Sequence, residues 1–347
     1  MASETTQPPA GFERMRNVGW LGLALLLALV FVSISGVSSD AGDEFVRSSL
    51  TDWGSDHVGQ SFPDYITGDE CLFCHRRDVG STWHDNAHQT TLRRATHDDP
   101  TVAALLNEHK GIAPPDFLLG SKRLTRFLGK STAYGKLDLL DVILHPQQKD
   151  SHRTAATTDS PTYDTTAFSN RCAGCHTTAV DSRTASFSAT SLDCFTCHGD
   201  VDLAHTKDTE HIFLSEVNRD PRKVVSTCGQ CHLRGGQSRS TERPYPNTFV
   251  PGDNLFHDFD IDLSNEAIES LPVIEQHIYS NCRDVGTGRD VSVTCLSCHT
   301  VHEQSSKKHQ LLDKSHHCNS CHDANMDLVD DLRTANLLEN HNKTCDY

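Results

Sequence analysis

The feature that most constrains this chain is a pentapeptide, Cys-x-x-Cys-His, which occurs six times in 347 residues. In chain order, motifs 1 to 6 consist of Cys71, Cys74 and His75; Cys172, Cys175 and His176; Cys194, Cys197 and His198; Cys228, Cys231 and His232; Cys295, Cys298 and His299; and Cys318, Cys321 and His322. The cysteine and histidine frequencies of the chain predict about 0.04 such pentapeptides by chance, so the pattern is not accidental. The motifs use twelve of the fourteen cysteines.

The spacing within each motif suits covalent attachment of a haem. Residues i and i+3 share one face of a helical turn, so the two thiols can each bond a vinyl group of one porphyrin. The histidine that follows then coordinates the iron. The sequence therefore predicts six haem c groups, with the motif cysteines as thioether residues and the motif histidines as proximal iron ligands.

Other uses of paired cysteines fit the pattern less well. Zinc ribbons do not require a histidine directly after every pair, and two ligand pairs make one zinc site. Thioredoxin-like motifs occur singly on a βαβ unit. A disulfide framework would not repeat the two-residue gap six times. Haem attachment is therefore the interpretation that we adopt.

Each iron needs a sixth ligand or an open position, and this choice separates an electron carrier from an enzyme. Beyond the first 41 residues the one methionine is Met326. It lies four residues after His322 on the same face of a predicted helix, so it cannot reach the far side of that haem. Sixteen of the twenty-two histidines lie outside the motifs. We therefore expect two histidine ligands on most irons, and low reduction potentials.

Seven histidines are candidates for the distal position. His205 and His302 follow a motif closely, and His277 lies on a predicted helix. The candidates are His88, His205, His277 and His302, with a second group of His257, His317 and His341. The two cysteines outside the motifs, Cys282 and Cys345, form a disulfide or stay free.

The N-terminus carries an export signal. No charged residue occurs between Arg16 and Asp40, and residues 21–32 are continuously apolar. Basic residues precede this run, as the positive-inside rule requires. The uncharged stretch, residues 18–37, also reaches the roughly 20 residues that span a bilayer. Residues 1–41 are therefore predicted to be a cleaved signal peptide or a retained membrane anchor, and the rest of the chain to lie on the periplasmic side of the inner membrane.

After the export signal we expect a polar linker over residues 42–66 and a hexahaem domain over residues 67–347. Within the domain, Pro100 follows an aspartate and precedes an apolar-periodic stretch, which predicts a helix start. Residues 116–129 and 136–144 are predicted to form short strands around a turn.

The intervals between motifs predict which haems are neighbours. The first cysteines of motifs 2 and 3 are 22 positions apart, and those of motifs 5 and 6 are 23 apart. Short connections keep elements close in space, so we expect each of these pairs to be adjacent. A terminal helix is predicted after Cys321 from apolar residues at helical spacing.

Composition limits the partners and the core. The net charge of −16 argues against nucleic acid, which needs clustered basic residues. With glycine counted and tyrosine left out, apolar residues are about 40% of the chain, below the share of ordinary globular domains. A protein-only core is therefore not expected, and haem would supply the missing apolar surface.

Local signatures in a fixed order resemble one family. They are CLFCHRRDVGSTWHDNAH, LLGSKRLTRFL, CAGCHTT, LDCFTCHGDVDLAH, STCGQCHLRGG with FVPGD, and VTCLSCHTVHE. This order is similar to that of the multihaem cytochromes c related to the tetrahaem cytochrome c of ammonia oxidisers and to hydroxylamine-oxidoreductase-like cytochromes, over roughly residues 67–325. The resemblance implies a mainly α-helical fold with few short strands, whose core is a chain of stacked haems, and electron transfer in the periplasm.

The resemblance also assigns roles to particular positions. The histidine of the family's Trp-x-x-Ser-x-His pattern matches His88, with Asn86 where serine is usual. The distal histidine after the family's Cys-His-Gly-Pro-Gly run matches His205, although this chain lacks the Pro-Gly pair. The Cys-His-x-x-His feature matches the stretch that ends at His302. Cys282 stands where many relatives have a methionine or histidine.

The first functional interpretation is a periplasmic electron carrier with six covalently bound haems, most of them held by two histidines. Its partners would be redox proteins, basic or membrane-bound, and residues 18–37 would hold it to the membrane if the leader is retained. The alternative is a haem-dependent oxidoreductase that acts on a small nitrogen or sulfur compound at one five-coordinate haem. No lysine replaces a motif histidine, so one signature of nitrite-reducing relatives is missing.

Overall fold

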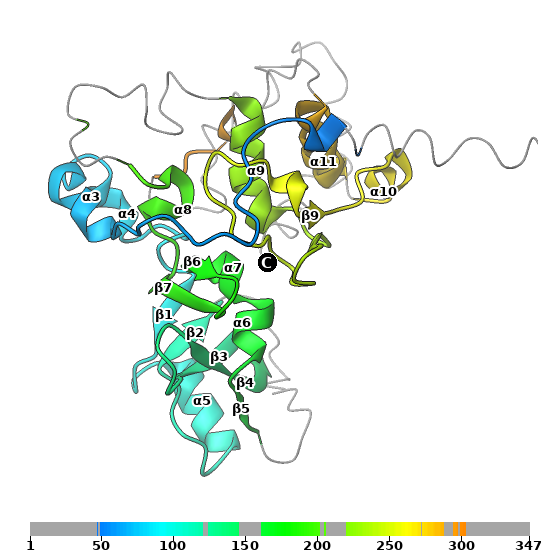
Figure 1. Cartoon of the computed structure of the whole chain (residues 1–347). Coiled ribbons are helices and arrows are strands. Elements are labelled where there is room, and N and C mark those ends of the chain that lie inside the picture. Colours follow the sequence, from blue (N-terminus) through cyan, green and yellow to red (C-terminus); the bar gives the residue numbers. More distant parts are fainter. Residues whose placement is uncertain are drawn as a thin grey trace, which may run out of the picture. The chain divides into compact units, whose positions relative to one another are not determined.

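The computed structural model describes residues 47, 49–120, 124–145, 161–201, 205, 220–271, 273–287, 294–297 and 299–302. The chain divides into two compact units, residues 1–49 and 50–347. All elements named below belong to the second unit (Figure 1).

A five-stranded antiparallel sheet lies between motifs 1 and 2 in the chain. Its strands run in chain order across the sheet: β1 (Leu92–Arg94), β2 (Phe117–Leu119), β3 (Thr125–Lys130), β4 (Leu137–Leu144) and β5 (Tyr163–Asp164). The register pairs Leu118 with Phe127 and Leu128 with Leu139. Successive residues of a strand point to opposite faces. Because apolar residues occupy both sets of positions in β3 and β4, both faces of the sheet are buried.

One face of the sheet is covered by helix α5 (Pro100–Glu108). Asp99 caps this helix by accepting a hydrogen bond from the backbone N–H of Thr101, and Pro100 occupies its first turn. This confirms the helix start that the sequence predicted. Val102 and Leu105 of α5 pack against a cluster of strand residues, namely Leu118, Phe127, Leu140, Val142 and Leu144.

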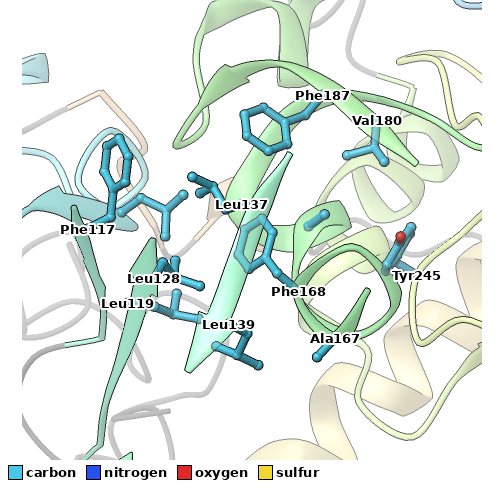
Figure 2. Close-up of a cluster of buried hydrophobic side chains, with 12 residues drawn as sticks. Phe117, Leu119, Leu128, Leu137, Leu139, Ala167, Phe168, Val180, Phe187 and Tyr245 are labelled. Atoms are coloured by element: carbon cyan, nitrogen blue, oxygen red, sulfur yellow. The ribbon is translucent and has the colours of Figure 1, made fainter. Parts of the chain in front are cut away.

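The opposite face carries the second apolar cluster, drawn in Figure 2. Phe168 from α6 (Ala167–Arg171) packs on Leu139 and its neighbours, and its ring meets that of Phe187 edge-on at 6.2 Å. Phe187 belongs to the hairpin of β6 (Thr177–Asp181) and β7 (Ser186–Thr190). Cys172 and Cys175 of motif 2 pack against this cluster. The sheet therefore supports the second motif.

These observations correct the expected fold class. The expectation of a mainly α-helical chain with few short strands is wrong for the described residues, which contain the five-stranded sheet and two further two-stranded sheets. The apolar content averaged over the whole chain is low, but leucine and phenylalanine are frequent in residues 117–144. This region therefore builds a core from protein side chains alone.

The remaining helices are short and mostly carry the motifs. They are α3 (Gly68–His75), α4 (Gly80–Trp83), α7 (Ala173–His176), α8 (Cys194–His198), α9 (Pro221–His232), η1 (Leu255–His257), α10 (Asn265–Glu269), α11 (Val273–Gly286) and η2 (Cys295–Ser297). A small sheet pairs β8 (Gln237–Ser238) with β9 (Phe259–Asp260). Helix α9 repeats the start of α5, because Asp220 caps it and Pro221 follows.

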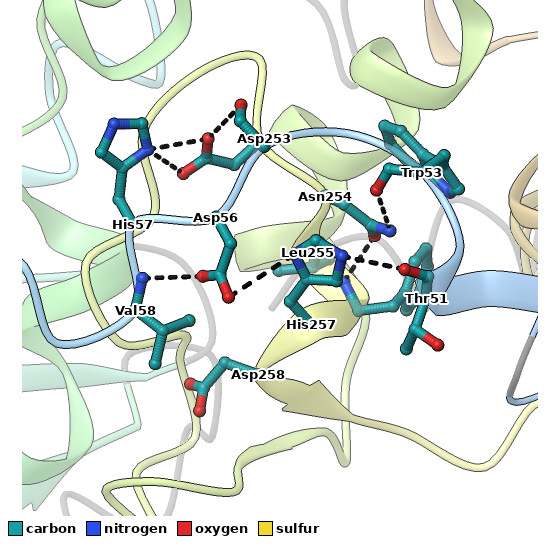
Figure 3. Close-up of polar contacts among 12 residues, drawn as sticks. Thr51, Trp53, Asp56, His57, Val58, Asp253, Asn254, Leu255, His257 and Asp258 are labelled. Atoms are coloured by element: carbon teal, nitrogen blue, oxygen red, sulfur yellow. Dashed lines mark hydrogen bonds and ion pairs between the residues drawn. The ribbon is translucent and has the colours of Figure 1, made fainter.

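Residues 50–66, in the segment expected as a polar linker, are attached to the rest of the unit (Figure 3). The buried side-chain amide of Asn254 donates hydrogen bonds to the carbonyl oxygens of Leu50 and Trp53, at 2.8 and 2.7 Å. His57 Nδ1 lies 2.8 Å from a carboxylate oxygen of the buried Asp253. The Arg222 guanidinium lies over the Trp53 ring at 5.2 Å.

Several predictions lie outside the described residues. They concern the export segment at residues 18–37, motif 6, the terminal helix, and the candidates His317 and His341. Within the residues that are described, no helix is long and apolar enough to cross a membrane.

Candidate haem sites

The described motifs share one local design, in which a short helix carries each Cys-x-x-Cys-His. Motifs 1 to 4 lie on α3, α7, α8 and α9, and motif 5 begins on η2. Three of these helices have a capping residue whose side-chain oxygen accepts a hydrogen bond from a backbone N–H. The capping residues are Thr67 at α3, Asp193 at α8 and Asp220 at α9. Such caps stabilise a helix end by about 1 kcal/mol, which helps helices as short as five residues to form.

The histidine of motif 1 faces a second imidazole. The ring centroids of His75 and His205 are 6.1 Å apart, and the ring planes are 5° from parallel. Two imidazoles on opposite sides of one metal, each with a metal–nitrogen bond of about 2.0 Å, have centroids about 6.2 Å apart. The distance between the two ring centroids is therefore the one expected for two histidines that hold one iron.

Two further motif histidines have the same relationship with a partner. His198 of motif 3 faces His302, with centroids 6.0 Å apart and planes 20° from parallel. His232 of motif 4 faces His88, with centroids 6.3 Å apart and planes at 87°. In all three pairs the partner is a histidine that the sequence proposed as a distal ligand.

The electrostatics of these rings favour the neutral form. Burial lowers the pKa of His88, and neighbouring His299 and His302 lower it further. The His232 side chain is exposed, but the protein atoms around its ring lower its pKa, and the neighbouring His88 and His299 lower it further. Neutral imidazole is the form that coordinates a metal. The protein environment therefore keeps these side chains ready to act as ligands.

His176 of motif 2 differs from the other three. Burial lowers its pKa to about 4, and its Nδ1 is buried without a hydrogen-bond partner. No histidine ring within the described ranges faces it at the distance seen in the three pairs. An imidazole in such surroundings stays neutral, which suits a proximal ligand.

The cysteines bring different motifs into contact. The thiol of Cys194 donates a hydrogen bond to that of Cys71, which lowers the pKa of Cys71 to about 7 and raises that of Cys194. Equivalent thiol contacts join Cys231 to Cys175 and Cys228 to Cys295, and they lower the pKa of Cys175 and Cys295. Motif 1 thus adjoins motif 3, and motif 4 adjoins motifs 2 and 5.

Motifs 2 and 3 are linked in another way. The β6–β7 hairpin connects them, and the hydroxyls of Thr178 and Thr196 lie 3.1 Å apart. The backbone N–H of Asp193 donates to the Thr178 hydroxyl at 3.0 Å. The short interval between these motifs therefore predicted their proximity, but it did not predict the thiol contacts with motifs 1 and 4.

Other candidate residues have different surroundings. His257 Nε2 lies 2.9 Å from the carbonyl oxygen of Thr51, and its Nδ1 lies 3.7 Å from Asp56 Oδ2, so this ring holds the segment at residues 50–58 (Figure 3). His277 lies on α11, as the sequence predicted. Cys282 is a buried free cysteine on the same helix, and burial raises its pKa.

Sequence reasoning missed the supporting contacts of two residues. Asp193 accepts a hydrogen bond from the Tyr65 hydroxyl in addition to capping α8. Its position directly before a motif was a capping signal that could have revealed this role. Asn86 is fully buried and contacts the residue before His302. No local pattern could have indicated that contact, since the partner lies 215 residues away.

A haem iron needs only two protein ligands, because the porphyrin supplies four nitrogens. The described residues contain no group of three or more His, Cys, Asp or Glu side chains arranged to hold a metal ion. Paired imidazoles beside cysteine pairs match the needs of a covalently bound haem rather than those of a zinc centre.

Comparisons with known proteins add little to this picture. No protein-family model matches the chain, and no curated protein matches it. Among solved structures, the chain is similar to an undecaheme cytochrome from the S-layer of Carboxydothermus ferrireducens, with a TM-score of 0.41 and 17% sequence identity. The match covers 77% of this chain and 44% of that cytochrome, so the chain spans less than half of its length. Motifs and histidine pairs, rather than this similarity, support haem binding here.

Proposed function

We propose that this protein is a multihaem c-type cytochrome that carries electrons between redox partners through six covalently bound haems. The observation that carries the proposal is the set of three histidine pairs, each with one motif histidine and one distant histidine at a separation of 6.0–6.3 Å. Random surface histidines would not meet motif histidines three times at the spacing that a shared iron requires.

When bound, each haem would supply an iron that gains and loses one electron. The chain's contribution is to hold that iron between fixed imidazoles, so that little rearranges when its charge changes. The twelve motif cysteines would bond the porphyrins, and the motif histidines would be the proximal ligands. His205, His302 and His88 would be the distal ligands for motifs 1, 3 and 4.

The contacts between motifs support a relay of electrons rather than six isolated centres. The helices of motifs 1 and 3 contact each other, as do those of motifs 2 and 4 and of motifs 4 and 5, and a cysteine of each motif interacts with one of its neighbour. Because the motif cysteines would bond the porphyrins, contacts between two motifs would keep their haems next to each other. Electrons that enter at one motif can therefore pass to the next without leaving the protein.

Motif 1 offers a contact point for a partner. Phe73, between its two cysteines, is 88% exposed. An exposed aromatic residue beside a redox centre suits transient docking of a redox protein. We propose that such a partner exchanges electrons at motif 1, on the periplasmic side of the inner membrane to which the export signal would deliver the chain.

Two measurements on the purified holoprotein test the proposal. Mass spectrometry of the mature chain should show six haem additions, and any smaller number would overturn the haem assignment. The electron paramagnetic resonance spectrum of the oxidised protein should be wholly low-spin. A clear high-spin signal would instead favour an oxidoreductase with an open iron position.

A further inference from the structure

The turn between α4 and β1 carries His88, one of the histidines that face motif histidines. Helix α4 and this turn also bind the stretch that ends at His302, through Thr82 and Asn86. Asn86 lies in this turn, two residues before His88, and its side chain is 0% exposed.

The oxygen and the nitrogen of the Asn86 side-chain amide each make a hydrogen bond. Its Oδ1 accepts a hydrogen bond from the backbone N–H of His88 at 2.9 Å. Its Nδ2 donates to the carbonyl oxygen of Val301, directly before His302, at 2.8 Å. A single carboxamide therefore fixes the backbone of one histidine and the backbone next to the other.

Neighbouring contacts make Asn86 a rigid support. Its backbone carbonyl accepts hydrogen bonds from the Thr90 N–H and hydroxyl, at 3.1 and 2.9 Å. The Thr82 hydroxyl donates to the carbonyl oxygen of His302 at 2.8 Å, and the Trp83 ring meets the His302 ring edge-on at 6.3 Å. The carbonyl oxygens of Val301 and His302 therefore each accept a hydrogen bond, and these two bonds fix the backbone at His302.

The chemistry of this position calls for an amide. Asparagine has a separate donor and acceptor, whereas an ionised aspartate only accepts and alanine does neither. In a buried site, a carbonyl or N–H that loses its partner costs about 1–3 kcal/mol. Such strain would be relieved by movement of the two loops that carry the histidines.

We propose that Asn86 is a positioning residue that sets the distal histidines of two irons at once, His88 for motif 4 and His302 for motif 3. This inference rests on the proposed haem function. It makes ligation at two motifs depend on one side chain that touches neither iron.

The first test compares the Asn86→Ala holoprotein with the wild type. Six haems should remain attached, because the motif cysteines are intact. The oxidised spectrum should gain a high-spin signal that integrates to as many as two haems per chain, and two of the six reduction potentials should shift. His88→Ala and His302→Ala provide references, since each should convert a single haem.

Asn247→Ala is a matched control. Asn247 is also buried, and its amide also makes side-chain hydrogen bonds, to Ser240 and Thr248, but none to a histidine. Loss of the Asn247 side chain should lower the free energy of unfolding and leave all haems low-spin. If Asn86→Ala behaves like Asn247→Ala, with lower stability and unchanged spin states and potentials, the inference is wrong.

Two milder variants cover the case in which Asn86→Ala fails to accumulate. Asn86→Asp keeps the acceptor for His88 and loses the donor to Val301, so one haem rather than two should change. Thr82→Val removes the hydroxyl contact to His302 and should affect the same haem. Unchanged spectra in both variants would also overturn the inference. Failure of the proposed function looks different, because His88→Ala and His302→Ala would then leave the spectrum unchanged.

Discussion

The imidazole rings of His75 and His205 are 5° from parallel, whereas those of His88 and His232 stand at 87° to each other. This difference matters because the π system of an imidazole that holds an iron would overlap one iron d orbital, the one whose lobes extend perpendicular to the ring plane. Parallel rings act on the same d orbital and separate the orbital energies strongly. Perpendicular rings act on both orbitals and leave their energies close together.

The oxidised protein should therefore show two kinds of low-spin signal. The parallel pairs predict rhombic spectra, and the perpendicular pair predicts a signal with one very large g value. His88→Ala should remove the large-g signal of motif 4, and His205→Ala should remove the rhombic signal of motif 1. Electron paramagnetic resonance at low temperature makes the measurement. Loss of a rhombic signal in His88→Ala would contradict the geometry of that pair.

The sheet core should contribute stability that does not depend on haem ligation. Phe127 is 0% exposed in the cluster that α5 covers. Phe127→Ala is expected to lower the free energy of unfolding by about 3–5 kcal/mol, because it removes a large buried side chain and leaves a cavity. Denaturant unfolding of the holoprotein measures this loss, while mass spectrometry should still find six haems.

Tyr134→Ala is the control for that variant. Tyr134 is 93% exposed in the connection between β3 and β4, so its removal should change the free energy of unfolding by less than about 0.5 kcal/mol. Similar losses in the two variants would show that the sheet core is not the source of stability.

Local signals in the sequence predicted local structure well. Asp99 and Pro100 predicted the start of α5, and the apolar stretches predicted strands where β2, β3 and β4 lie. The full sheet could not be predicted, because β1 and β5 have only three and two residues and pair through contacts between distant segments. Strands of that length carry too few residues for a periodic pattern.

The histidine pairs show the same limit. Position alone identified His88, His205 and His302 as candidates, since each lies in a distinctive stretch or shortly after a motif. Which motif each one faces could not be deduced, because His198 and His302 are separated by 104 positions and meet only in the fold. The sequence shows how many histidines could serve as distal ligands. Which motif each of them faces can be known only from the fold.

Tyr65 and Asp193 predict a pH-dependent stability. Burial raises the pKa of Asp193, and the hydrogen bond from the Tyr65 hydroxyl opposes that rise. A carboxyl whose folded pKa exceeds its unfolded value of about 3.9 binds protons more readily in the folded state, so stability falls as the pH rises through the folded pKa. Tyr65→Phe raises the folded pKa further, so the fall should extend to higher pH and become larger.

The expected loss in Tyr65→Phe is small below pH 4, where the carboxyl is protonated in both states. Above the folded pKa it should reach about 1.5–3 kcal/mol, the contribution of a hydrogen bond to a charged group. Unfolding curves at a series of pH values make the comparison, with the exposed Tyr134→Phe as control. A loss that is constant across pH would show that the two residues are not coupled.

Gly174, the residue before Cys175 in motif 2, allows a close contact with an aromatic ring. A Cβ atom at this position would lie 2.2 Å from Tyr245 Cγ. The ring cannot move aside freely, since Tyr245 is 4% exposed and its hydroxyl donates to the carbonyl oxygen of Ser169. Gly174→Ala should therefore displace the motif 2 helix, and mass spectrometry should find five haems rather than six.

Gly229 in motif 4 gives the matched comparison. A Cβ there would meet the side-chain ends of Leu233 and Leu255 at 2.9 and 3.0 Å, and these atoms can rotate away. Gly229→Ala should therefore keep six haems. A full haem complement in Gly174→Ala alone would show that the contact with Tyr245 does not limit attachment at motif 2.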